Sequence, residues 1–172
     1  MEPALPGMLA YAGYLLWIGA GLADFTLHRR SDLPHTSGLA ESRLHLAQLG
    51  VVGLAIFLWW ALAPGWTAWG LAAACVVLHA FVGYADTRSA WRRRDIVPLE
   101  QHIHSVLDFA PWLFLAWYAA QVLDAPGGGL RWQPRPWTIW LWLGVPAGGV
   151  GLVALREFRD AWRVARARTV TS

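Results

Sequence analysis

The chain has 172 residues, of which 56% are hydrophobic and only 15% are charged, and its mean hydropathy is +0.37. A typical soluble domain has roughly 25% charged residues, so this composition excludes an ordinary soluble domain and indicates an integral membrane protein. The formal net charge of +3 does not indicate nucleic-acid binding, because the arginines lie where membrane topology explains them.

Five stretches are apolar and long enough to cross a bilayer, whose hydrocarbon core needs about 20 residues of helix. The predicted spans are residues 7–28, 39–63, 66–91, 98–123 and 137–157. Short connections join them, so we expect one compact all-α transmembrane domain over residues 1–172, in which four of the five helices form a bundle around a polar site at the cytoplasmic end. The first stretch is too long for the apolar region of a signal peptide, so we expect it to be retained. Residues 158–172 are expected to form a basic interfacial tail.

The arginines predict the topology, since the chain contains no lysine. Twelve of the 14 arginines flank the same ends of the predicted spans, whereas Arg131 and Arg135 lie on the other side. The positive-inside rule then predicts an outside N-terminus and a cytoplasmic C-terminus. We expect a multi-pass protein of a prokaryotic inner (cytoplasmic) membrane.

Paired carboxylates and histidines recur near the predicted cytoplasmic ends of the first four spans. The pairs are Asp24/His28, Glu41/His45, His79/Asp86 and Glu100/His104. Residues four apart lie roughly 40° apart around a helix, and residues seven apart roughly 20° apart, so each pair can face one interior point. Ionisable side chains are costly inside a bilayer, so several at one depth indicate a buried functional site.

A structural explanation accounts for one such pair but not for the set. An i,i+4 carboxylate–histidine pair is usually a local hydrogen bond or ion pair, and the helix dipole favours Glu41 and Glu100 in their first helical turns. The dipole disfavours Asp24 near a helix C-terminus, and it disfavours cationic His45 and His104 near N-termini. A purely ionic cluster would also face a large desolvation cost, so we favour a metal site.

The ligand inventory predicts two metal ions. Imidazoles and carboxylates suit iron, manganese or zinc, and such pairs on facing helices are typical of di-iron and di-manganese carboxylate proteins. Those proteins use E-x-x-H where this chain has E-x-x-x-H, and the H-x-x-H-H boxes of membrane desaturases are absent, so no family is identified. Iron is the favoured metal, with zinc or manganese as alternatives. The predicted ligands are Asp24, His28, Glu41, His45, His79, Asp86, Glu100 and His104.

A metal site near one leaflet suits an apolar substrate. Our leading hypothesis is a di-iron-type oxidoreductase or hydroxylase that acts on a membrane lipid or another apolar small molecule, with an electron donor as partner. Asp108 and Tyr84 are the candidate catalytic residues, which would orient ligands or relay protons.

Three alternatives stay open from the sequence. Zinc with three protein ligands would make a membrane hydrolase. A b-type haem held by His79 with His104 or His45 would make an electron-transfer subunit. A chain of Asp and His side chains would carry protons or metal ions.

In the fifth span, Gly144 and Gly148 form a G-x-x-x-G step, which is typical of close helix packing or of a homodimer.

Overall fold

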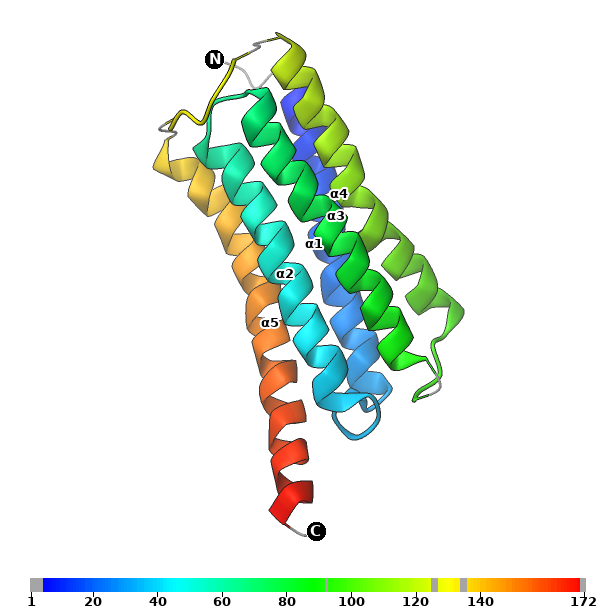
Figure 1. Ribbon diagram of the computed structural model, residues 1–172. Helices are drawn as coiled ribbons and strands as arrows, with labels where there is room; N and C mark the ends of the chain where they lie inside the picture. Colours follow the sequence, from blue (N-terminus) through cyan, green and yellow to red (C-terminus); the bar gives the residue numbers. More distant parts are fainter. Residues whose placement is uncertain (1–4, 92, 125–126, 134–135, 171–172) are drawn as a thin grey trace.

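The computed structural model describes residues 5–91, 93–124, 127–133 and 136–170. Five long helices lie side by side (Figure 1), and each is long and apolar enough to cross a membrane. This confirms the all-helical prediction; the described residues contain no strand, only one isolated bridge between Leu62 and Trp132. The elements are α1 (Leu5–Arg30), the short 3-10 helix η1 (Leu33–His35), α2 (Gly38–Ala61), α3 (Trp66–Ala90), α4 (Pro98–Asp124) and α5 (Trp137–Val170).

Helix ends lie within two residues of the predicted spans, with one exception. Pro98 begins α4, where its missing N–H costs nothing. Gly38 begins α2 with a φ of +60°, a conformation that favours glycine. The exception is α5, which continues to Val170 instead of ending at residue 157, because residues 158–170 are rich in alanine and arginine, which favour helix. The expected tail is therefore a continuation of α5.

The helices form a closed ring. α2 packs against α3 and α5, α1 packs against α4 and α5, and α3 packs against α4. Hence α5 is the fifth wall of the ring, which corrects the expectation that four helices alone surround the polar site. The reason is an inward stripe at helical spacing on α5. Its buried members are Val150, Ala154, Glu157 and Ala161.

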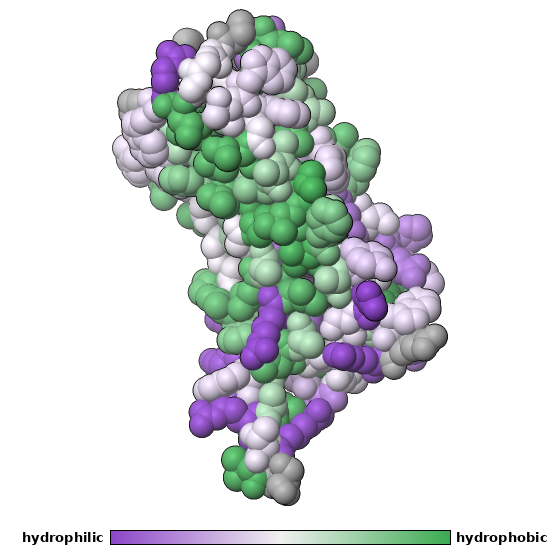
Figure 2. Space-filling model, viewed as in Figure 1, coloured by the Kyte–Doolittle hydropathy of each residue, from purple (hydrophilic) through white to green (hydrophobic). Residues whose placement is uncertain are grey.

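The interior differs between the two ends of the ring. Towards the end where α3 begins, the buried side chains are mostly apolar, as in the cluster of Ala72, Val76 and Leu115. We call the other end, where α1 and α3 finish and α2 and α4 begin, the polar end, because the buried carboxylates and histidines lie there. On the visible surface, apolar residues dominate the middle of the molecule and hydrophilic residues gather near the C-terminal end of α5 (Figure 2).

Candidate metal centre

All five helices place ionisable side chains in one cluster at the polar end. We call this set the carboxylate–histidine cluster, and all of its members are buried except His104, whose side chain is 16% exposed. The members are Asp24 and His28 from α1, Glu41 and His45 from α2, Asp86 from α3, Glu100 and His104 from α4, and Glu157 from α5. The carboxylates come from every wall of the ring, so no single helix dipole explains them.

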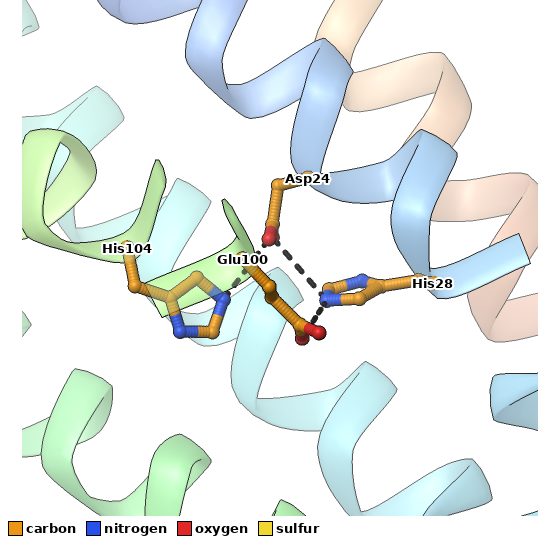
Figure 3. Close-up of side chains that lie close together, drawn as sticks. All are labelled: Asp24, His28, Glu100 and His104. Carbon is orange, nitrogen blue, oxygen red and sulfur yellow. Dashed lines mark ion pairs between the residues drawn. The ribbon is translucent and has the colours of Figure 1, made fainter. Parts of the chain in front are cut away.

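Four of these residues converge on one point (Figure 3). Asp24, His28, Glu100 and His104 each offer one ligand atom, and these atoms all lie within 4.8 Å of one another. The two oxygens of Asp24 face different rings, with Oδ2 3.4 Å from Nε2 of His28 and Oδ1 3.0 Å from Nε2 of His104. Oε1 of Glu100 lies 3.5 Å from the same Nε2 of His28. Two nitrogens and two oxygens therefore surround a position that suits one cation.

A second group adjoins the first. Nε2 of His45 lies 3.3 Å from Oδ2 of Asp86 and 3.8 Å from Oε1 of Glu41, and the three residues meet the same 4.8 Å criterion. Oε1 of Glu41 is also 3.8 Å from Nε2 of His28. Glu41 thus lies between the two groups and is a candidate ligand for either.

Glu157 orients the imidazoles of both groups. Its Oε2 lies 3.1 Å from Nδ1 of His28, and its Oε1 lies 2.7 Å from Nδ1 of His45. An ionised carboxylate only accepts hydrogen bonds, so both Nδ1 atoms donate to Glu157 and, in the neutral rings, both Nε2 atoms keep a lone pair. A carboxylate on the far nitrogen is the usual support of a metal-ligating histidine. His28, His45 and Glu157 also form a group that could hold an ion, but the two hydrogen bonds already use both Nδ1 atoms and both Glu157 oxygens.

Arg94, in the connection between α3 and α4, closes the cluster on the loop side. Its side chain is 2% exposed, and its Nη2 contacts Oε1 of Glu41 at 2.6 Å and Oε1 of Glu100 at 2.5 Å. Burial opposes the charge of Arg94, but the hydrogen bonds to Glu100 and Glu41 outweigh it and raise the pKa of Arg94 above its usual value. Arg94 is therefore a permanent cation beside two of the carboxylates.

The charge of the cluster fits two divalent ions. Five carboxylates and one guanidinium leave four negative charges when the imidazoles are neutral, as ligation requires, and two divalent cations supply four positive charges. Among the described atoms, Nε2 of His28, Nε2 of His45 and Oδ1 of Asp86 are buried without a hydrogen-bond partner. Such buried polar groups are costly, and metal coordination would satisfy them. The residues present therefore fit the metal that their spacing predicts.

The structure brings seven of the eight predicted ligands together, and His79 is the exception. His79 is buried, but it belongs to neither group; it lies deeper, against a cavity, where it interacts electrostatically with Asp108. Asp108 lies on an exposed part of α4 near Gly83. Tyr84 is 68% exposed, since two residues of helix turn it roughly 200° away from Asp86. Neither candidate catalytic residue joins the cluster.

Sequence reasoning missed Glu157 and Arg94. Glu157 could have been found from the helical spacing of Val150, Ala154 and Ala161. It lies three residues after Ala154 and four before Ala161, so it shares their buried helix face. The sequence indicates only a topology role for Arg94.

Comparisons with protein-family models, with curated proteins and with solved structures find no match for this chain. A functional proposal therefore depends on the geometry of the cluster.

Proposed function

We propose that this chain is a membrane metalloprotein whose carboxylate–histidine cluster binds two metal ions, with iron preferred, and oxidises an apolar substrate. One observation carries the proposal: Glu157 holds His28 and His45 through their Nδ1 atoms, so that both Nε2 atoms face carboxylates and share only Glu41. The bias of the arginines supports a cytoplasmic position for the polar end.

The two groups divide the ligands between two ions. Asp24, His28, Glu100 and His104 would hold one ion, and His45 and Asp86 would hold the other, with Glu41 between them. The rings of His28 and His45 stack 4.6 Å apart with planes 4° apart, so their Nε2 lone pairs lie in nearly parallel planes. Rings this close bring the two ligand groups side by side, as a dinuclear centre with ions roughly 3.5–4 Å apart would require.

Iron bound at such a centre would supply dioxygen activation. The overall reaction would convert a C–H bond, O₂, two electrons and two protons into a C–OH bond and water, with the electrons from an external donor protein or quinol. This chain's residues would fix the Nδ1–H tautomer of both imidazoles through Glu157 and would hold Glu41 and Glu100 against Arg94. Burial of the ligands would exclude bulk water from the reacting position.

A zinc-dependent hydrolase is the second candidate. Glu41, His45 and Asp86 provide three ligands, which is the number that catalytic zinc sites use while leaving a fourth position for water. Haem is less well supported, because Nε2 of His45 and Nε2 of His104 already face carboxylate oxygens at 3.3 Å and 3.0 Å, which leaves no room for a porphyrin against either ring.

Absorption spectroscopy on protein purified in detergent tests the oxidative proposal. We expect a near-ultraviolet band that depends on iron, and consumption of O₂ after anaerobic reduction. Both signals should be lost in His45→Ala and retained in His102→Ala, since His102 is exposed and outside the cluster. Stoichiometric zinc without a band would favour the hydrolase, a Soret band would favour haem, and the absence of all three would refute a metal centre.

A further inference from the structure

Two cavities lie inside the ring beyond the cluster. The cluster-side cavity has a volume of about 320 Å³, and Asp24, His45, Gln48 and His79 line one part of it. The far cavity has a volume of about 290 Å³, and its lining comes from all five helices. Each volume is near the lower limit of known small-molecule sites, which is roughly 300 Å³.

The two cavities adjoin. Trp17, Val52 and Ile56 line both of them. Along α1, the lining runs from Asp24 to Gly7, which is about 26 Å at 1.5 Å per residue. A hydrocarbon core of about 30 Å contains two layers of lipid chains, so one chain spans about 15 Å. The combined space is therefore at least as long as one lipid chain.

The lining is polar only near the cluster, where Gln48 and His79 join Asp24 and His45. In the far cavity, the hydroxyls of Tyr11 and Tyr14 donate to the backbone carbonyls of Trp142 and Leu143, and the indole N–H of Trp17 donates to another backbone carbonyl. These side chains thus present carbon to the interior. At the other end, Nε2 of His45 is buried without a hydrogen-bond partner, and the His45 side chain is only 5% exposed. A suitable occupant has a long apolar chain with its reacting part near His45.

Between α2 and α5, glycines leave part of the cavity lining without side chains. Gly50 and Gly53 on α2 and Gly151 on α5 line the cluster-side cavity, and a Cβ added at any of the three would meet no atom within 4 Å. Gly50 and Gly53 are also exposed, on the part of the ring that would face lipid. A chain could therefore enter sideways from the bilayer.

We infer that the two cavities form one site for the hydrocarbon chain of a membrane lipid, which enters between α2 and α5 and places part of its length beside Asp24 and His45. The inference rests on the proposed function and specifies its substrate class. The geometry favours a chain over a small apolar molecule, because the space extends well beyond the cluster and stays apolar along its length.

Photolabelling of the full chain in phospholipid vesicles tests this site. The probe is stearic acid with a diazirine at mid-chain, and peptide mass spectrometry locates the label, which we expect on Trp17, Val52 or Ile56. Gly53→Leu adds a side chain to the cavity and should reduce this labelling about tenfold, the factor that a penalty of about 1.4 kcal/mol gives. Gly70→Leu is the matched control, because Gly70 is equally exposed and equally open but lines neither cavity.

Metal content measured on the same samples separates the two proposals. Lost labelling with unchanged metal in Gly53→Leu supports the lipid site. Label confined to outward side chains such as Leu16 and Leu54, or label unchanged in Gly53→Leu, overturns it even if the metal is present. If the purified protein contains no metal and the label is still found in the cavities, the lipid site is supported and the metal centre is refuted. A parallel arm with phosphatidylcholine carrying the same diazirine chain distinguishes an esterified lipid from a free fatty acid as the occupant.

Discussion

The imidazoles of His28 and His45 stack face to face, with centroids 4.6 Å apart and planes 4° apart, although they come from different helices. One carboxylate, Glu157, holds both rings through their Nδ1 atoms. Two imidazolium rings stacked this closely would repel each other, whereas two neutral rings would not. The stacking therefore links α1, α2 and α5 in a single arrangement that suits two neighbouring cations.

Glu157→Ala should weaken metal binding without removing a direct ligand. Loss of the acceptor frees both rings to rotate and to change tautomer, and comparable support residues contribute about 10- to 100-fold in metal affinity. Competition with a chelator of known affinity measures the change. Asp160→Ala is the control, because Asp160 lies on the same helix but is half exposed and pairs only with arginines. Equal affinities for Glu157→Ala and the parent chain would show that Glu157 does not position the ligands.

Arg94→Gln should destabilise the metal-free protein more than the metal-bound protein. Without ions, the guanidinium is the only permanent cation that contacts the cluster in the described structure, and removing one partner of a buried ion pair costs about 3–5 kcal/mol. Thermal unfolding in detergent, with and without metal, measures the difference. Arg93→Gln, which changes an exposed neighbour, should leave both curves unchanged. A loss of stability independent of metal would mean that Arg94 has a structural role only.

Removal of metal should itself lower the melting temperature. Chelation removes cations that five buried carboxylates would face, and a ligand at 1,000 times its dissociation constant stabilises the folded state by about 4.1 kcal/mol. Scans of chelated protein, before and after addition of Fe²⁺ or Zn²⁺, measure the effect. Added Mg²⁺ is the control, since it is a poor match for imidazole ligands. A melting temperature that no metal changes would contradict a site in this cluster.

His79→Gln should keep the full metal content. His79 borders the cluster-side cavity but lies in neither ligand group, so its loss removes no ligand. Tyr84→Phe, on the outer face of α3, should likewise change nothing. Elemental analysis of both variants checks this expectation. A fall in bound metal in His79→Gln would restore the eight-ligand set that spacing alone predicts.

The difference between spacing and structure has simple physical causes. Residues four apart lie on adjacent turns, so the pairs Asp24/His28 and Glu41/His45 reach one point as predicted. His79 and Asp86 share a helix face, but seven residues separate them by about 10 Å along the axis, so only Asp86 reaches the cluster. Two side chains on one helix meet at the same point only when they share both a helix face and a position along the helix axis.

The two missed residues depend on packing between elements. Glu157 joins the cluster because α5 packs between α1 and α2, a choice that no pattern within the first four spans reveals. Arg94 joins it because the connection from α3 turns its side chain inward, whereas its neighbour Arg93 is exposed. The sequence alone does not distinguish an arginine that turns inward from an exposed neighbour in the same run. The sequence predicts the five helices and the end at which the ionisable residues gather, but it does not predict that Glu157 and Arg94 join them.

Metal stoichiometry is the most direct test of the central claim. Mass spectrometric elemental analysis of the full chain, purified without added metal and without a histidine tag, should give about two ions per chain, mainly iron, as dinuclear carboxylate proteins hold. Asp24→Asn should reduce this to about one ion or fewer, because Asp24 faces both His28 and His104 in the first group. Less than one iron, manganese or zinc ion per chain in the parent protein, with the same value in Asp24→Asn, would contradict the account.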